Sequence, residues 1–127
     1  MNKSARQILK QKLAAGGCLA APGVYDGLSA RIADPMNFDV LYLSGYGVSA
    51  SLLAKPDAGF LTAENMVMRL TSLCEFLHTP LIADADTGFG GIAETQATVR
   101  AYEKAGAAGI QLEDQKFPKK CGHTPGR

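Results

Sequence analysis

The sequence has no apolar run long enough to cross a membrane, no excess of charge of either sign, and few cysteines. A membrane-spanning helix needs roughly 20 apolar residues, and residues 1–17 are too polar to contain the apolar core of a secretory signal. The net charge is +1 and the basic residues are scattered, so nothing indicates nucleic acid or an anionic membrane surface as a partner. We therefore expect a cytoplasmic protein.

The three cysteines are an odd number at wide spacings, which excludes a disulfide framework and a CxxC zinc motif. Cys18 and Cys74 have apolar neighbours and are predicted to be small core residues. Cys121 differs because it lies between two lysines and a histidine, where positive charge favours the reactive thiolate.

The composition that remains, 46% hydrophobic and 20% charged over 127 residues, is typical of a single globular unit. Helical patterns alternate with short apolar runs along the whole chain. They predict helices over residues 4–17, 28–33, 62–77 and 91–106, and strands over residues 18–23, 40–47, 81–84 and 108–114, the second strand running into a glycine loop. Strands that alternate with helices in this way pair in parallel through right-handed crossovers.

Particular residues mark the expected ends of the helices. Ser4 and Thr62 can cap the first and third helices. Pro35 is expected to close the second helix, and Gly106 to stop the fourth. The apolar stripes of the third and fourth helices predict a core that includes Met66, Leu70, Leu73, Leu77, Val99 and Tyr102.

This order predicts an α/β fold of about four βα units, the N-terminal half of a (β/α)8 TIM-type barrel, with residues 1–127 as one unit. Residues 115–127 form a polar tail with no helical or strand pattern. Both outer strands of a half-barrel would have unpaired edges, so we expect a second half-barrel or a partner chain to cover them. An open four-stranded sheet is the simpler alternative.

Each predicted strand ends in polar residues. In parallel α/β folds the loops after the carboxyl ends of the strands build the functional site. Side chains alternate along a strand, so Asp84 and Asp86 point the same way, as do Gln111 and Glu113. The other polar residues at these ends are Tyr25, Asp26, Tyr42, Ser44 and Asp114.

Three acids at neighbouring strand ends predict a metal site. Asp84, Asp86 and Glu113 would repel one another strongly unless they are protonated or neutralised. Oxygen ligands alone favour Mg²⁺, with Mn²⁺ as an alternative. A single acid in such a place usually caps a helix or binds loop amides, which is our interpretation of Asp26 and Asp114. The glycines of residues 44–47 and 87–91 leave backbone amides bare beside the predicted metal, where an anionic oxygen could approach.

The tail adds cations and a thiol. Lys119, Lys120 and His123 could close over a dianionic substrate while Cys121 delivers or removes a proton. A lysine pair taken alone is more often a solvated surface. His78, which lies at a helix-to-strand turn, is interpreted as structural.

Several segments of the sequence resemble the isocitrate lyase and phosphoenolpyruvate mutase superfamily in order and spacing. The resemblance extends over residues 19–127, and KKCGH is typical of the carbon–carbon lyase branch, with methylisocitrate lyase and 2,3-dimethylmalate lyase as examples. The segments are APGVYDGLSARIA, YLSGYG, KPDAGFLT, ADADTGFGG, AGAAGIQLEDQ and KKCGH.

The resemblance implies a (β/α)8 barrel with magnesium at the strand ends, usually in a homo-tetramer built from dimers that swap a terminal helix. Asp84 would be the direct metal ligand, and water molecules would connect the metal to Asp57, Asp86 and Glu113. The carboxylate of a 2-oxo acid would reach the metal near Asp84 and be bound by Ser44, Gly45 and Tyr46.

The resemblance also implies roles in the reaction. Tyr42 would stand beside the reacting oxygen, and Cys121 would protonate the carbanion-like product. The gating loop, within a mobile segment 115–127, would contain Lys119, Cys121, Gly122 and His123.

The implied activity is a magnesium-dependent lyase that cleaves a 2-hydroxy di- or tricarboxylate to a 2-oxo acid and a carboxylate. Alternatives are a carboxyphosphonoenolpyruvate phosphonomutase, an oxaloacetate hydrolase, or a truncated and catalytically silent half-barrel. Tyr46 stands where methylisocitrate lyases have glycine, which narrows the pocket. The second half of the barrel, where the family keeps the arginine for the distal carboxylate, is not in these residues.

Overall fold

Four short strands form one parallel sheet in the order β1-β2-β3-β4. The computed structural model describes residues 4–116, 119–122 and 124–125. The strands are β1 (Gly23–Val24), β2 (Leu41–Leu43), β3 (Leu81–Asp84) and β4 (Gly109–Gln111). Sequence order equals spatial order, as it does around a (β/α)8 barrel. The predicted fold, four βα units of the N-terminal half of a TIM-type barrel, is confirmed.

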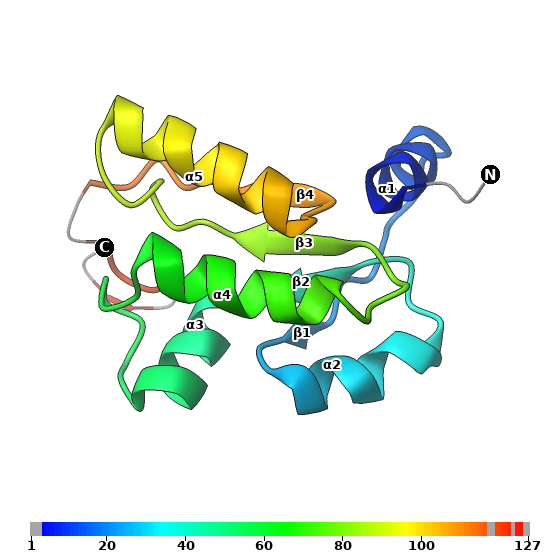
Figure 1. The fold of residues 1–127 in the computed structure, drawn as a ribbon, viewed down its shortest axis with the longest axis horizontal. Helices are drawn as coiled ribbons and strands as arrows, with labels where there is room; N and C mark the ends of the chain where they lie inside the picture. Colours follow the sequence, from blue (N-terminus) through cyan, green and yellow to red (C-terminus); the bar gives the residue numbers. More distant parts are fainter. Residues whose placement is uncertain (1–3, 117–118, 123, 126–127) are drawn as a thin grey trace.

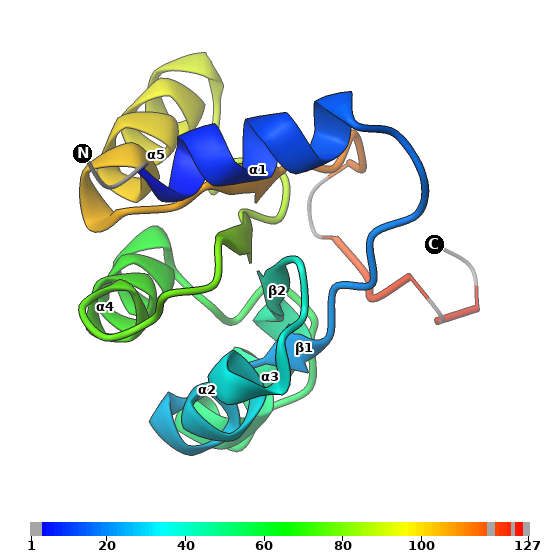
Figure 2. The same ribbon diagram turned by 90° about the vertical axis from the view of Figure 1, so that its right-hand side faces the viewer.

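Helices cover one face of this sheet. Figure 1 shows α4 and α5 side by side across the strands, and Figure 2, which looks along the strands from their amino ends, shows α2, α4 and α5 on the same side. The helical segments are α1 (Ala5–Ala14), α2 (Gly27–Ala33), the 3-10 turn η1 (Asp34–Met36), α3 (Gly45–Val48), the π-helical turn η2 (Ser49–Leu53), α4 (Ala63–Cys74) and α5 (Ile92–Ala105).

The predicted helix ends are set by side chains that satisfy free backbone groups. Ser4 and Thr62 both form capping boxes, in which the cap side chain accepts from the third helical N–H and the third side chain bonds back. Asp26 forms a third such box with Ser29, which confirms its interpretation as a cap. Gly106 ends α5 with a φ of 104°, a left-handed conformation that glycine adopts without steric cost.

The core lies between the sheet and these helices. On α4, Met66, Leu70 and Leu73 are buried as predicted. Leu77 is partly buried against the same cluster. On α5 the buried positions are Thr98 and Tyr102.

The inward face of α5 differs from the prediction. Val99 is only half-buried, because the helix turns Thr98 to the inside instead. The apolar pattern could not predict the burial of Thr98, because a threonine is buried there only when its hydroxyl donates to a buried carbonyl.

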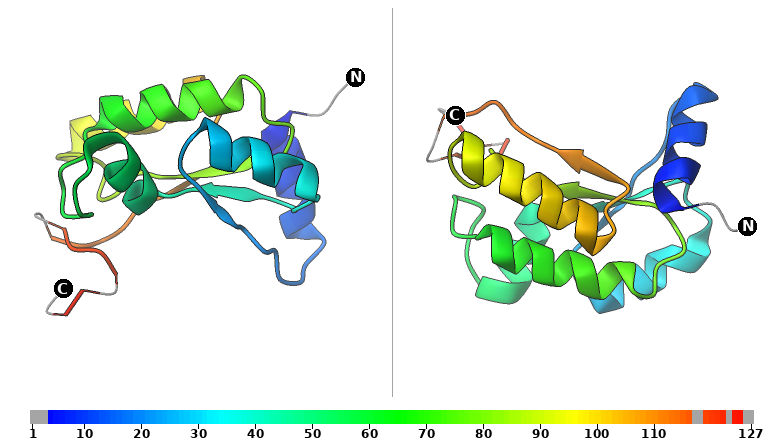
Figure 3. Two further views of the ribbon diagram at one scale, coloured as in Figure 1. Left: turned by 90° about the horizontal axis from the view of Figure 1, so that it is seen from below. Right: turned by 45° about the horizontal axis from the view of Figure 1, so that its top comes forward.

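Helix α1 closes the amino end of the sheet, opposite the end where the tail lies (Figure 3). Leu9 is 4% exposed, and a Cβ added to Gly109 would lie 3.3 Å from its Cδ2. Arg6 fastens α1 to the end of α5 through Ala107 O at 3.1 Å and Glu103 Oε1 at 3.0 Å.

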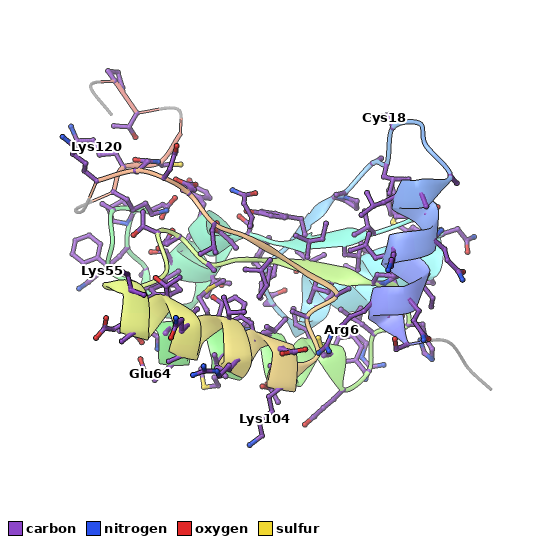
Figure 4. The ribbon with its side chains drawn as sticks, turned by 90° about the horizontal axis from the view of Figure 1, so that it is seen from above. Arg6, Cys18, Lys55, Glu64, Lys104 and Lys120 are labelled. Atoms are coloured by element: carbon purple, nitrogen blue, oxygen red, sulfur yellow. The ribbon has the colours of Figure 1, made fainter. Side chains whose placement is uncertain are left out.

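Three local predictions were wrong. The first strand is the pair Gly23–Val24 and not residues 18–23, and Cys18 is exposed in the loop that follows α1 (Figure 4). Apolar residues form a strand only where a neighbour offers backbone partners, and β1 pairs with β2 alone. The glycines after β2 begin helix α3 and not a loop.

The predicted end of the second helix is confirmed. Helix α2 ends at Ala33, and Pro35 lies in the turn η1 that follows, where its missing N–H is not required.

None of the helices within the described residues is both long enough and apolar enough to span a bilayer.

Candidate functional site

The site is built around Asp84, the last residue of β3, which is 7% exposed. Its two carboxylate oxygens have different backbone donors. Oδ1 accepts from the N–H of Asp86 at 3.0 Å, and Oδ2 accepts from the N–H of Gly45 at 3.2 Å. Asp84 therefore joins the carboxyl end of β3 to the first residue of α3.

Glycine at position 45 is required by this contact. A Cβ there would lie 2.7 Å from Asp84 Oδ2, and the atom it would meet is the buried carboxylate itself. Because position 45 has no Cβ, the Asp84 carboxylate can lie against the backbone at the end of β2. The sequence predicted this kind of contact between a glycine backbone and a charged group. Gly47 is used differently, since a Cβ there would lie 2.6 Å from Cβ of Tyr25.

A buried lysine from the tail bridges two acids of this region. Nζ of Lys119 lies 2.7 Å from Oδ1 of Asp57 and 2.5 Å from Oδ1 of Asp86. The exposed fractions of the three side chains are 3% for Lys119, 8% for Asp57 and 9% for Asp86. The loop before α4, the loop after β3 and the tail therefore meet at one point.

Negative charge exceeds positive charge in this buried group. Three carboxylates (Asp57, Asp84, Asp86) against the one ammonium of Lys119 leave a charge of −2 when all are ionised. Burial raises the pKa of Asp86; its ion pair with Lys119 opposes this, and the charges of Asp84 and Asp57 add to it. Burial alone would lower the pKa of Lys119, but its bonds to Asp57 and Asp86 raise it. The lysine is therefore charged, and the acids remain under-compensated.

The backbone around Asp86 is in an uncommon conformation. Its φ is 47°, in the left-handed region that non-glycine residues rarely adopt, and Phe89 at 62° is a second case in the same loop. Asp86 is held there by its N–H bond to Asp84 and by its carbonyl, which accepts from Glu113 N at 2.8 Å. Such conformations cluster at functional sites because the surroundings must maintain them.

Two tyrosines face the acids from opposite sides of β3. Tyr42 of β2 is half-buried, and burial together with the charge of Asp84 and a hydrogen bond to it raises the pKa of its hydroxyl. Tyr102 of α5 is fully buried, and its hydroxyl donates to the backbone oxygen of Asp84 at 2.9 Å. Both hydroxyls therefore stay protonated beside the carboxylates.

The predicted carboxylate-binding residues lie at the start of α3. Ser44 accepts from Gly47 N at 3.1 Å and so caps α3, while Gly45 is buried against Asp84 and Tyr46 is 54% exposed. Ser44 and Tyr46 line a cavity of about 480 Å³ together with Tyr25. A larger cavity of about 700 Å³ between α4 and α5 is mostly apolar. The lining of neither cavity includes Asp57, Asp84 or Asp86.

The fourth strand connects to the tail through Gln115. Its Nε2 donates to Glu113 Oε2 and, at 3.1 Å, to Lys120 O, while its Oε1 accepts from Lys120 N at 3.2 Å. Glu113 is half-buried and Lys120 is exposed. Sequence reasoning missed Gln115; its only signal was its place directly after the acidic strand end.

The remaining predicted site residues in the described part of the chain are Cys121 and Gly122. Cys121 is half-buried and Gly122 is exposed, at the carboxyl end of the sheet where Lys120 and Lys55 also lie (Figure 4). His123 lies outside the described residues. Over residues 4–116, 119–122 and 124–125, no three histidine, cysteine, aspartate or glutamate side chains converge closely enough to ligate one ion together.

The residues present fit a hard divalent cation held mainly through water. The donors are carboxylate oxygens, the charge excess is −2, and Asp84 lies in a space that only glycine at position 45 leaves open. Mg²⁺ usually keeps several waters and takes one or two direct carboxylates, so a converging set of three protein ligands is not required.

Residues 9–125, nearly the whole chain, match the family described as phosphoenolpyruvate phosphomutase. The chain belongs to this family. The resemblance to the isocitrate lyase and phosphoenolpyruvate mutase superfamily is thereby confirmed.

Similar proteins within this superfamily carry out related reactions. The chain is 48% identical over 127 residues to the 2,3-dimethylmalate lyase of Eubacterium barkeri, covering all of this chain and 43% of that protein. Among solved structures, oxaloacetate acetylhydrolase in complex with 3,3-difluorooxalacetate aligns with a TM-score of 0.91 at 40% identity, over 97% of this chain and 42% of that one. Phosphonopyruvate hydrolase, solved with oxalate and Mg²⁺, aligns with a TM-score of 0.87 at 35% identity, over 93% and 41% of the two chains. This member of the superfamily thus spans less than half the length of each of these relatives.

Proposed function

We propose that the chain carries the metal-binding half of a magnesium-dependent carbon–carbon lyase. The substrate would be a 2-hydroxy di- or tricarboxylate, cleaved to a 2-oxo acid and a carboxylate. The single observation that carries the proposal is the under-compensated group of buried acids at the carboxyl ends of β2 and β3. Buried charges that serve only stability are paired, and these are not fully paired.

Asp84 would be the direct ligand of Mg²⁺, or of Mn²⁺. Asp57, Asp86 and Glu113 would hold it through its waters, and when bound it would stabilise negative charge that develops on the substrate's 2-oxygen. The bonds from Gly45 N and Asp86 N orient the Asp84 carboxylate before any ligand arrives. Pre-orientation of this kind lowers the reorganisation needed on binding.

The 2-oxo-acid end of the substrate would bind at the start of α3. Gly45 contacts Asp84 there, and its neighbours Ser44 and Tyr46 line a cavity. Tyr42, whose hydroxyl stays protonated, would donate a hydrogen bond to the reacting oxygen. The exposed ring of Tyr46 would limit the size of the substituents that fit.

The tail would supply the proton and close the site. Cleavage leaves the electron pair of the broken carbon–carbon bond on the departing carboxylate fragment, and the thiol of Cys121 would give its proton to that carbon. Residues 115–127 would act as the gating segment, including Lys119, Gly122 and His123. The contacts of Lys119 with Asp57 and Asp86 and of Gln115 with Lys120 support closure of the tail over the acids.

The solved relatives also support a second type of reaction. Oxaloacetate acetylhydrolase and phosphonopyruvate hydrolase align with this chain as well as the lyases do, so hydrolysis of oxaloacetate or a phosphonomutase reaction is the runner-up. Cys121 within KKCGH favours the lyase, because a carbanion needs a proton donor and a phosphoryl transfer does not.

The pocket would be completed by residues outside this chain. Both edges of the sheet, β1 and β4, are unpaired within the described residues, and the relatives are more than twice as long. A second half-barrel, in the same polypeptide or in a partner copy within a homo-oligomer, would cover these edges and bind the distal carboxylate. Without that second half-barrel, this chain would be catalytically silent.

The test is a coupled assay for 2-oxo acids with a panel of 2-hydroxy diacids, including 2,3-dimethylmalate, in Mg²⁺ and in EDTA. We expect release of a 2-oxo acid in Mg²⁺ that EDTA abolishes, from the full-length protein. Rearrangement of a phosphoenol substrate to its carbon–phosphorus isomer, or release of oxalate from oxaloacetate, without cleavage of any 2-hydroxy diacid, would favour the runner-up. No metal-dependent turnover of any of these substrates would contradict both.

A further inference from the structure

Two hydroxyl groups of α5 bind the backbone of the loop that carries the acids. Tyr102 donates to the carbonyl of Asp84 at 2.9 Å, and Thr98, one turn earlier, donates to the carbonyl of Gly88 at 3.2 Å. Both side chains are buried, with exposed fractions of 0% and 3%. Residues four apart lie on one face of a helix, so this face of α5 meets the loop at both of its ends.

Two carbonyls between these ends are bound without α5. Ala85 O accepts from Gly88 N at 2.8 Å, and Asp86 O accepts from Glu113 N at 2.8 Å. The carbonyls at the two ends of the loop are the ones that α5 side chains satisfy. A buried carbonyl that loses its donor is costly, so each hydroxyl fixes one end of the loop strongly.

The loop needs such fixing because its conformation is strained. Asp86 has a φ of 47°, which is strained for a residue with a side chain. Gly88, with a φ of 92°, must be glycine, because a Cβ there would lie 2.2 Å from Oγ1 of Thr95, again on α5. The buried carboxylates of Asp84 and Asp86 also repel each other across this loop. Both effects would move the acids apart if the ends of the loop were released.

We propose that Tyr102 and Thr98 are positioning residues that hold the 84–88 backbone so that Asp84 and Asp86 face one cation. This inference rests on the proposed magnesium site and adds to it the element that sets its geometry. Neither side chain would touch the metal or the substrate, since both reach the loop from the helix side of the sheet. Their effect is carried by backbone carbonyls alone.

Three variants separate the hydroxyls from packing. Tyr102→Phe keeps the ring that fills the core, and Thr98→Val keeps the shape of the side chain, while each removes one hydroxyl. Thr98→Ser is the matched control, because it keeps the hydroxyl and loses a methyl group. Each would be made in the full-length protein, with Leu73→Val as a core change near the end of α4, where Leu73 lines a cavity with Arg69 and Phe76.

Two measurements are made on each variant: the dissociation constant for Mg²⁺ by calorimetry, and hydrogen exchange of the Asp86 and Gly88 amides without metal. We expect Tyr102→Phe and Thr98→Val to weaken Mg²⁺ binding by about 10-fold, the lower end of the range for groups that support metal ligands. Exchange at Asp86 and Gly88 should rise more than exchange in β4. Thr98→Ser and Leu73→Val should leave binding within about 2-fold of the wild type.

The outcomes separate this inference from the proposed function. If the wild type binds no Mg²⁺, the proposed metal site is wrong. If it binds Mg²⁺ and the two hydroxyl-deleting variants bind it equally well, the positioning role is wrong while the site stands. Equal weakening in Leu73→Val would also overturn it, because the effect would then follow stability and not the loop.

Discussion

The two ends of the sheet shift the pKa of an aspartate in opposite directions: that of the half-buried Asp34 is lowered and that of the buried Asp86 is raised. At the amino end, Asp34 accepts from Thr79 N at 2.9 Å and from His78 N at 3.2 Å, and these donors lower its pKa although burial alone would raise it. At the carboxyl end, burial and neighbouring acids raise the pKa of Asp86 in spite of Lys119. Asp34 is fully supplied with donors and acts as a structural clamp. The acids of the carboxyl end have one cation, Lys119, for three carboxylates, which leaves charge for a ligand to neutralise.

The contrast extends to the backbone. The amino end is closed by the amphipathic helix α1, with Leu9 buried and Arg6 bound to α5. The carboxyl end contains the positive φ angles of Asp86 and Phe89 and a lysine drawn from a distant part of the chain. The amino end of the sheet thus stabilises the fold, while the carboxyl end contains strained backbone and excess charge. This division between the two ends is usual in barrel enzymes.

The largest expected effect is on catalysis and involves the tail. Cys121→Ser should slow cleavage of the preferred 2-hydroxy diacid by about 100-fold or more, because a hydroxyl is a much poorer acid than a thiol and general acids contribute about 10²–10⁴-fold. Mg²⁺ affinity should change little. Turnover and calorimetric binding would be measured on the same preparation, and unchanged turnover would remove Cys121 from the role of acid.

Next in size is the loss of the buried ammonium. Lys119→Met leaves Asp57 and Asp86 buried and unpaired, which should lower the free energy of unfolding by about 3 kcal/mol without metal. Added Mg²⁺ should recover part of this loss, since it supplies the missing charge. Urea denaturation with and without Mg²⁺ measures both terms. A variant as stable as the wild type in EDTA would show that the acids do not depend on Lys119.

A smaller effect is expected at the amino end. Asp34→Asn should lower the free energy of unfolding by about 1–2 kcal/mol, because a neutral amide accepts more weakly from His78 N and Thr79 N, and its NH2 group cannot accept from His78 N as Oδ2 does. Mg²⁺ affinity should not change. A loss of metal binding in this variant would break the distinction between the two ends.

The same clamp should respond to acid. Since the pKa of Asp34 is lowered in the folded state, its contribution is complete above the ordinary aspartate value of 3.8 and is lost as the pH falls through the folded pKa. The stability difference between wild type and Asp34→Asn should therefore shrink below about pH 4. Urea denaturation at pH 7 and pH 3 measures it, and a constant difference would contradict this assignment.

Local sequence signals predicted most of the fold. Ser4 and Thr62 stand before helical patterns and satisfy nearby N–H groups, so their caps depend on few distant contacts. The placement of Asp84 and Asp86 at the end of β3 follows from strand alternation and a glycine-rich turn. These are short-range consequences of the chain, and they hold whatever surrounds them.

Long-range contacts could not be predicted. Lys119 contacts Asp57 across nearly half of the sequence, and nothing in KKCGH predicts which acids it contacts. Cys18 has apolar neighbours in the sequence, as core residues do, but it is exposed in the structure. Thr98 was overlooked because its burial depends on a carbonyl of the folded loop, and Gln115 because its partners come from β4 and the tail.

The most direct test of the magnesium site compares the wild type with Asp84→Asn by calorimetric titration of Mg²⁺. The variant keeps the size of the side chain and an oxygen acceptor but removes one negative charge from the buried group. The account predicts that the wild type binds one Mg²⁺ and that Asp84→Asn loses about 100-fold or more in affinity. Equal Mg²⁺ binding by the two proteins, or none by the wild type, would contradict it.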